Sequence, residues 1–314
     1  MMQDIIAIVG PTASGKTGLS VAMAKHFGAD IVSADSMQIY REMNIGTAKP
    51  SMEECCGVRH HLMGHVGVEQ SYNVVSYVKD ARAVLDRLCS ERKLPILCGG
   101  TGLYIDHLLS DTDFFDIPFD AAVRARFQTI ADEQGPQALY SLLQKTDPIL
   151  AEKLHPNDIK RVIRGLEVFT TTGRKLSDYQ NDSHRESPFR VLYLGLNYKD
   201  RSLLYERINK RVDLMVEDGL IEEVRELMDN YTLSDTARAA IGYKEIIDCI
   251  EAGGELSSAI ELIKQKSRNY AKRQLTWFGK NKEILWLYPD ETDLEVLQAQ
   301  AIGLISEFLK GGNE

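Results

Sequence analysis

The sequence has few cysteines, no long apolar run and no excess of basic charge. Its five cysteines, at positions 55, 56, 89, 98 and 249, form an odd set without C-x-x-C spacing, which is typical of unpaired thiols in a reducing compartment. No stretch reaches the ~18 apolar residues of a membrane helix, and residues 1–9 lack the basic segment of a secretion signal. We therefore expect a cytoplasmic protein that does not bind membranes.

Basic residues are outnumbered, with 37 Lys and Arg against 46 Asp and Glu and a formal net charge of -9. Affinity for nucleic-acid phosphates comes from clustered Lys and Arg, so RNA binding over the whole surface is excluded. Two basic islands remain. Residues 264–282 carry seven bases and no acid, and residues 158–175 carry five bases against two acids. Any RNA site must therefore be local.

The chain of 314 residues has room for one large domain with a sizeable insertion. Apolar runs that alternate with helical patterns predict a parallel sheet with covering helices. The predicted strands are residues 4–9, 29–34, 94–98, 190–195 and 284–287, and the predicted helices among them are residues 16–26, 73–92 and 294–309.

Residues 117–187 show no strand pattern, only amphipathic helical segments at 121–134, 136–144 and 157–171. We therefore expect an α/β core made of residues 1–116 and 188–314, interrupted by an all-helical insertion.

A phosphate-binding motif follows the first predicted strand directly and begins the first predicted helix. It has the pattern G-x4-G-K-[ST] and consists of Gly10, Pro11, Thr12, Ala13, Ser14, Gly15, Lys16 and Thr17. Backbone amides, the helix dipole and the Lys16 ammonium then converge on a polyphosphate, and Thr17 is expected to hold Mg²⁺. The motif predicts a P-loop NTPase-like core, but kinases, nucleotidases and transferases all use it.

Further segments narrow the choice. They are DSMQIY at 35–40, NIGTAKP at 44–50, GGTGLY at 99–104, AIGYKE at 240–245 and YAKRQLTWF at 270–278. Together with the P-loop, and in this order, they closely resemble the bacterial tRNA dimethylallyltransferase (tRNA isopentenyltransferase) family over essentially the whole chain. One departure is Met63-Gly64, where the family usually has Ile-Asp, so no carboxylate role is carried to that position.

The resemblance implies transfer of a dimethylallyl group from dimethylallyl diphosphate to N6 of adenine 37 in the tRNA anticodon loop. Magnesium is the implied cofactor, and a monomer is expected. An adenylate isopentenyltransferase acting on free nucleotides, or a P-loop ATPase or kinase, is the alternative. Asp35 follows the second predicted strand, at the edge where parallel sheets bind ligands, and is the candidate base that deprotonates the amine. Its alternatives are a magnesium ligand or a helix cap.

The remaining site residues are implied by the resemblance. Lys16 and Thr101 join Asp35 as catalytic residues, and Arg211 joins the P-loop at the diphosphate. The insertion is implied to clasp the anticodon stem-loop. The implied tRNA contacts are Asp35, Ser36, Met37, Gln38, Thr101, Arg124, Ile159, Lys160, Arg161, Val162, Ile163, Ala240, Ile241, Gly242, Tyr243, Lys244, Glu245 and Arg273.

Overall fold

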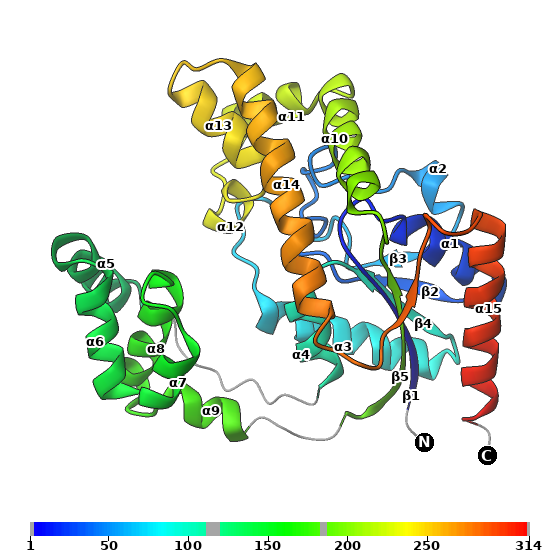
Figure 1. Cartoon of the computed structure of the whole chain (residues 1–314), viewed down its shortest axis with the longest axis horizontal. Coiled ribbons are helices and arrows are strands. Elements are labelled where there is room, and N and C mark those ends of the chain that lie inside the picture. Colours follow the sequence, from blue (N-terminus) through cyan, green and yellow to red (C-terminus); the bar gives the residue numbers. More distant parts are fainter. Residues whose placement is uncertain (1–2, 111–119, 183–186, 313–314) are drawn as a thin grey trace. The chain divides into compact units, whose positions relative to one another are not determined.

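The computed structural model describes residues 3–110, 120–182 and 187–312, and the chain divides into two compact units (Figure 1). The larger core unit is formed by Met1–Leu109 and Pro188–Glu314, and the smaller unit is the insertion, Ser110–Ser187. The boundary expected at residues 116 and 117 lies outside the described residues. Within the described ranges, no helix has both the length and the apolar character needed to cross a membrane.

A six-stranded parallel sheet forms the centre of the core unit, in the order β3-β2-β4-β1-β5-β6. Because the central strand β1 pairs with β4 and β5 and is covered on both faces, it reads as a continuous apolar run. The strands are β1 (Gln3–Val9), β2 (Asp30–Ser33), β3 (His60–His61), β4 (Pro95–Gly99), β5 (Phe189–Leu196) and β6 (Leu285–Leu287). The predicted parallel α/β fold is confirmed.

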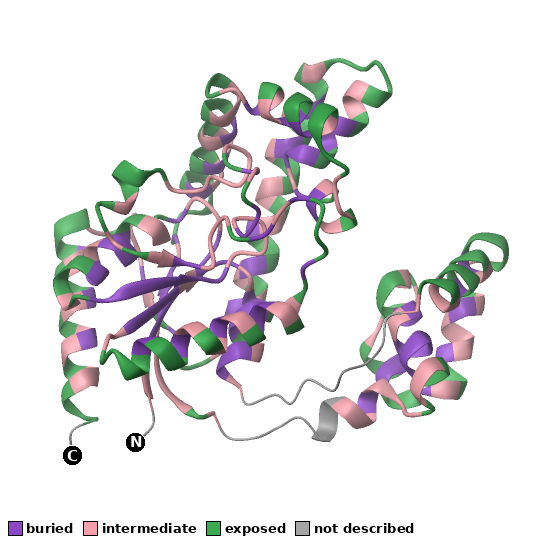
Figure 2. Ribbon diagram, turned by 180° about the vertical axis from the view of Figure 1, so that it is seen from behind, coloured by how far each residue is buried: buried purple, intermediate pink, exposed green. Residues whose placement is uncertain are grey.

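Helices cover the sheet on both faces, and buried residues follow the strands (Figure 2). Figure 1 shows α1 (Lys16–Phe27) and α15 (Leu294–Lys310) on one side of the sheet, with α3 (Val74–Ser90) and α4 (Gly102–Leu109) on the other. One apolar cluster joins Ile6 and Ile8 of β1 to Leu19 of α1 and Ile305 of α15. This burial holds the carboxyl ends of the strands in fixed positions.

A second group of helices in the core unit comes from the chain between β5 and β6 (Figure 1). It consists of α10 (Arg201–Glu217), α11 (Leu220–Asn230), α12 (Asp235–Arg238), α13 (Tyr243–Glu251) and α14 (Leu256–Phe278). Helix α14 packs against α10, α13 and α4. The short helix α2 (Met52–Cys55) lies between β2 and β3 in the sequence.

The insertion is helical throughout its described part and has its own core. Its helices are α5 (Ala121–Gln134), α6 (Pro136–Thr146), α7 (Pro148–Lys153), α8 (Ile159–Thr172) and α9 (Leu176–Asp182). Phe127, Leu143, Leu150 and Val162 pack together in its centre. Glu167 is fully buried there, and its carboxylate accepts from the backbone of Asp120 as well as pairing with arginines.

Candidate functional site

The turn between β1 and α1 has a backbone that only small residues adopt easily. Gly10, Ala13 and Gly15 have positive φ angles of 145°, 61° and 96°. A Cβ atom on Gly10 would lie 2.5 Å from the carbonyl oxygen of Leu196, so glycine is required there. The turn leads into the amino end of α1, where free N–H groups and the helix dipole favour an anion.

Three basic side chains surround this turn. Lys16 Nζ donates to the Pro11 carbonyl at 2.6 Å, Arg207 Nε donates to the Ala13 carbonyl at 3.0 Å, and Arg211 donates to Thr12 Oγ1 at 3.3 Å. They line a hollow that we call the cationic cavity, formed by Ala13, Ser14, Gly15, Lys16, Thr17, Ala48, Pro50, Glu54, Arg207, Lys210, Arg211 and Leu214. Its lining is suited to a small, multiply charged anion.

Lys16 is poorly solvated in this arrangement. Burial lowers the pKa of its ammonium to about 8, and the neighbouring Arg211 adds to the decrease. Cys98 and Asp35 act in the opposite direction. An anion placed in the cationic cavity would restore the charged form, so anion binding and protonation of Lys16 are coupled.

The oxygen atoms at this turn are compatible with a magnesium ion that arrives with a diphosphate. Thr17 lines the cationic cavity, and the buried hydroxyl of Ser14 has no hydrogen-bond partner in the described part of the protein. Magnesium prefers oxygen ligands and takes few of them from the protein when it binds phosphates. Among the described residues, no three His, Cys, Asp or Glu side chains group to form a metal site of their own.

Asp35 and Thr101 come together because β2 and β4 are neighbours in the sheet and end at the same edge. Asp35 Oδ1 accepts from the backbone N–H groups of Met37 at 2.8 Å and Gln38 at 3.2 Å. Thr101 Oγ1 accepts from the Ser36 N–H at 3.0 Å, and the Thr101 N–H donates to Ala34 at 3.1 Å. The carboxylate is thus held in one orientation by its own turn.

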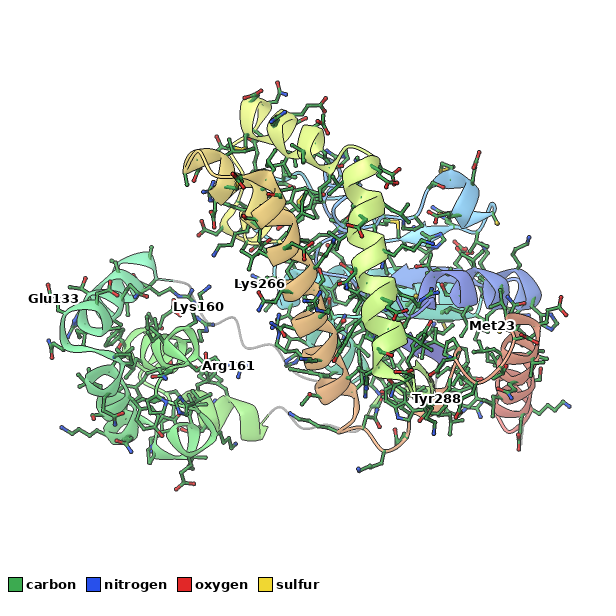
Figure 3. All side chains as sticks on the ribbon, turned by 45° about the horizontal axis from the view of Figure 1, so that its top comes forward. Met23, Glu133, Lys160, Arg161, Lys266 and Tyr288 are labelled. Atoms are coloured by element: carbon green, nitrogen blue, oxygen red, sulfur yellow. The ribbon has the colours of Figure 1, made fainter. Side chains whose placement is uncertain are left out.

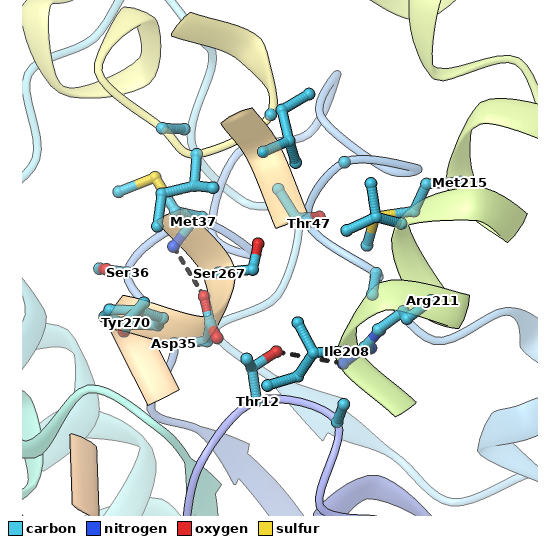
Figure 4. Close-up of a pocket in the computed structure, with 18 of the residues that line it drawn as sticks. Thr12, Asp35, Ser36, Met37, Thr47, Ile208, Arg211, Met215, Ser267 and Tyr270 are labelled. Atoms are coloured by element: carbon cyan, nitrogen blue, oxygen red, sulfur yellow. Dashed lines mark hydrogen bonds between the residues drawn. The ribbon is translucent and has the colours of Figure 1, made fainter. Parts of the chain in front are cut away.

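Asp35 faces a second hollow, which we call the apolar cavity, of about 270 Å³ (Figure 4). Ile208, Val212 and Met215 of α10 and Ile263 of α14 give it apolar walls. Its other lining residues are Thr12, Ala13, Asp35, Ser36, Met37, Gly46, Thr47, Ala48, Arg211, Ala239, Ala240, Ile241, Gly242, Ser267, Tyr270 and Arg273. Ala13, Ala48 and Arg211 line both cavities, which therefore adjoin.

Tyr270 forms part of the wall beside Asp35 (Figure 4). Burial raises the pKa of its phenol to about 12, and the negative charge of Asp35 adds to the increase. The phenol therefore stays protonated near neutral pH and can donate a hydrogen bond within the cavity.

The expected contacts of the core unit fall into two groups. Ser36, Met37, Ala240, Ile241, Gly242 and Arg273 line the apolar cavity together with Asp35. Gln38, by contrast, donates its amide N–H groups to the carbonyls of Thr47 at 3.2 Å and Ala48 at 3.1 Å.

Residues 243–245, which directly follow Gly242, differ in how far their side chains are buried. Tyr243 is fully buried and donates to Glu223, and Glu245 is buried with its carboxylate on the Gly242 N–H at 2.8 Å. Lys244 is exposed. Of residues 243–245, Lys244 is therefore the one whose side chain can contact a large ligand directly.

In the insertion, Lys160 and Arg161 are exposed at the start of α8 (Figure 3). Ile159 is half-buried, and Val162 and Ile163 belong to the insertion core. Arg124 Nε lies 3.0 Å from Glu167 Oε1 and is 41% exposed, so it can also face solvent.

Two residues that position the site were not found as such in the sequence. Gln274 is buried in α14; its Oε1 accepts from the Thr12 N–H at 2.8 Å and its Nε2 donates to Gly100 at 2.9 Å. It thereby ties the P-loop to the turn after β4. Glu223 holds the loop that contains Gly46. No pattern in the sequence marked Gln274, because a glutamine within a basic helix is ordinarily exposed and its burial is evident only in the fold.

The chain is similar to known enzymes along its whole length. A family model described as IPP transferase matches residues 38–282. A tRNA dimethylallyltransferase of Alkaliphilus metalliredigens is 45% identical, covering 95% of this chain and 96% of the relative. One from Carboxydothermus hydrogenoformans is 44% identical, covering 96% and 97%.

Similar proteins with solved structures are also tRNA-modifying transferases. The tRNA isopentenylpyrophosphate transferase of Bacillus halodurans has a TM-score of 0.73 at 38% identity, covering 99% of this chain and 100% of the other. A eukaryotic dimethylallyltransferase acting on tRNA has a TM-score of 0.80 at 29% identity, covering 98% and 80%.

Proposed function

Because this chain belongs to the IPP transferase family, we propose that it transfers the dimethylallyl group of dimethylallyl diphosphate to N6 of adenine 37 in the tRNA anticodon loop. The products are N6-isopentenyladenosine and diphosphate. The observation that carries the proposal is the junction of the two cavities at Arg211, since a cationic hollow there adjoins an apolar one with a carboxylate. Dimethylallyl diphosphate has a charged diphosphate and an apolar dimethylallyl group, and it needs a cationic cavity next to an apolar one.

The first requirement of the reaction is a stabilised leaving group. The allylic C1–O bond breaks as diphosphate departs, and the electron pair of that bond goes to the diphosphate oxygen. We assign the stabilisation of this charge to the P-loop amides with Lys16 and Arg211. These groups are held in advance by hydrogen bonds to the loop, so little reorganisation accompanies bond breaking.

The second requirement is a base, because the N6 lone pair of adenine is delocalised into the ring. We propose that Asp35 removes one N6 proton as N6 bonds to C1. Two backbone N–H groups hold Asp35 Oδ1, which aims the carboxylate at the apolar cavity. Thr101 would act by fixing the Ser36 segment and by contacting the reacting region.

Magnesium is part of the proposal as a diphosphate-bound ion. Thr17 would hold it, and its charge would neutralise the departing diphosphate oxygens when it is bound. The residues of this chain supply only part of its oxygen ligands, so we expect tight metal binding only with the donor present.

We propose separate RNA contacts within each unit. An unpaired adenine that leaves the loop stack would enter beside Ser36 and Met37, with Ala240, Ile241, Gly242 and Arg273 around it. Gln38 and Tyr243 would act by holding the walls in place. Arg124, Lys160 and Arg161 of the insertion would contact the backbone of the anticodon stem-loop.

Free adenosine phosphates as acceptors are the closest alternative. The insertion, a unit with its own core and exposed bases, favours RNA because a free nucleotide would not need it. A nucleotide-driven ATPase or kinase would use the P-loop as well, but it would leave the apolar cavity beside Asp35 without a role.

The test is to incubate the purified protein with Mg²⁺, radiolabelled dimethylallyl diphosphate and bulk tRNA. We expect label in tRNA and none in AMP. Label in AMP alone would favour the free-nucleotide alternative, and phosphate release from ATP without prenyl transfer would favour the ATPase. We also propose that the protein acts as a monomer in the cytoplasm, which sedimentation and fractionation would check.

A further inference from the structure

A loop without regular structure, residues 43–49, forms part of the walls of both cavities, and we call it the wall loop. Gly46, Thr47 and Ala48 line the apolar cavity, and Ala48 also lines the cationic cavity. Because the loop belongs to no helix or strand, its position depends on the side chains that bind its backbone.

Glu223 of α11 binds the first half of the wall loop through three successive N–H groups. Its Oε2 accepts from Asn44 at 2.9 Å and Ile45 at 2.9 Å, and its Oε1 accepts from Gly46 at 3.2 Å. Consecutive N–H groups that converge in this way form a small anion-binding nest. A carboxylate has the four lone-pair sites that such a nest needs, and a neutral amide has only half of them.

The same carboxylate also binds a second wall segment. Tyr243, the first residue of α13, donates its hydroxyl to Glu223 Oε1. Burial and the adjacent Glu223 raise the pKa of Tyr243 well above its usual range, so the phenol remains a donor. Tyr243 directly follows residues 240–242, which also line the apolar cavity.

The two walls also touch without room to spare. A Cβ atom on Gly46 would lie 2.5 Å from the ring of Tyr243 and 2.8 Å from Leu220. Any loosening of the contact would therefore separate Gly46 from the tyrosine and change the shape of the apolar cavity, which Gly46 lines.

The second half of the wall loop is held as firmly. Gln38 donates to the carbonyls of Thr47 and Ala48, and Lys49 Nζ donates to Tyr40 at 2.6 Å. Ala48 has a φ of 47°, a left-handed conformation that is unfavourable for a non-glycine residue. Such strain persists only where the surroundings enforce it, and here it falls on one of the residues shared by both cavities.

We propose that Glu223 is a positioning residue that fastens the wall loop to the start of α13 and so sets the width of the apolar cavity. The inference rests on the proposed function, since it assigns the consequence to the dimethylallyl group and the adenine. A cavity of fixed width holds C1 and N6 in the geometry of attack, and a wider one loses that alignment.

The experiment is steady-state kinetics of Glu223→Gln with the donor and an anticodon stem-loop, well below the unfolding temperature. The amide replaces one acceptor oxygen by an NH₂ group that faces backbone N–H groups. We expect kcat/KM to fall at least about tenfold, through both a lower kcat and a higher KM for the donor. Binding of the stem-loop should stay within about twofold, because the phosphate contacts that dominate RNA affinity remain.

Two further variants make the result specific. Tyr243→Phe removes only the hydroxyl, and we expect a smaller loss of the same kind. The double variant should be no slower than Glu223→Gln, because the two side chains act as one unit. Glu222→Gln, an exposed neighbour on α11, is the matched control and should behave as the wild type.

A Glu223→Gln protein with a lower melting temperature but wild-type kcat and KM would overturn the inference and leave Glu223 a purely structural role. The inference would also be overturned if Tyr243→Phe had wild-type kinetics and Glu223→Gln lost activity only because the protein unfolds. Failure of the proposed function is distinguishable, since the wild-type protein itself would then transfer no label.

Discussion

The core site and the insertion use basic residues in opposite ways. In the core, Lys16 and Arg211 point into a cavity and are hydrogen-bonded to the turn that they surround. In the insertion, Lys160 and Arg161 face solvent at the start of a helix (Figure 3). Charge fixed inside a cavity suits a small anion whose bond is to break, and charge on a solvated surface suits a large one that only docks.

The comparison predicts that core variants lower turnover and leave RNA affinity intact, with the largest effect at Asp35. Asp35→Asn keeps an oxygen for the Met37 and Gln38 N–H groups but removes the base. We expect kcat to fall by about 10³, within the range of general-base contributions. Single-turnover rates and stem-loop binding would measure this, and a rate within tenfold of wild type would mean that another group takes the proton.

Lys16→Ala should have the next largest effect, because it removes a preorganised charge from the leaving group. We expect about a 10² loss in kcat/KM for the donor, in line with the loss of one oxyanion-stabilising group. Lys25→Ala, at an exposed position near the end of the same helix, is the control. Equal losses in donor turnover and in stem-loop affinity would contradict the division of labour between the two units.

Met215→Ser tests the apolar wall and should act on binding of the donor. The loss of apolar contact with the dimethylallyl group amounts to about 1–2 kcal/mol, which raises KM for the donor about tenfold. Leu203→Ser, an exposed apolar position on the same helix, should change nothing. If Met215→Ser instead weakens only RNA binding, the donor tail lies elsewhere.

The pH dependence of donor binding follows from the pKa of Lys16, which burial lowers to about 8. Diphosphate binds the protonated form and raises this pKa, so affinity is full below about pH 8 and is lost above it. KM for the donor should rise several-fold from about pH 7 to about pH 9, and the rise should vanish in Lys16→Met. A flat profile in the wild type would show that Lys16 stays charged without the donor.

The smallest effects are expected in the insertion. Lys160→Ala and Arg161→Ala should each weaken stem-loop binding about two- to fivefold and lower its salt dependence by about one phosphate contact, with kcat unchanged at saturating RNA. Lys145→Ala, another exposed base of the insertion, is the matched control. A fall in kcat at saturating RNA would show that these insertion residues act in turnover, as the basic residues of the cationic cavity are proposed to do, and not only in RNA binding.

Much of the fold could be predicted because its elements carry strong local patterns. The buried run of β1 and the helical spacing of apolar residues in α3 and α8 each specify their own structure. Strand β3 was not predicted, because two residues, His60 and His61, carry no periodicity of their own. It forms by pairing with β2, a contact that lies outside any local window.

In the candidate site, too, contacts between residues distant in sequence could not be predicted from local patterns. The P-loop and Asp35 could be predicted because a motif or a strand end places them. The bonds of Gln274 to Thr12 and of Glu223 to Gly46 span distances in sequence that no spacing rule covers. Tyr243 lies in a segment expected to contact RNA, yet its own side chain is buried, because a recognisable segment does not reveal which of its side chains point inward.

A crystal structure with an unreactive thio-analogue of dimethylallyl diphosphate and an anticodon stem-loop would show where both substrates bind. We predict the diphosphate against Lys16 and Arg211, the dimethylallyl group in the apolar cavity, and adenine N6 within hydrogen-bond distance of Asp35. An isoprenoid group outside the apolar cavity, or an adenine that does not approach Asp35, would show that the two cavities and Asp35 do not form the site of prenyl transfer.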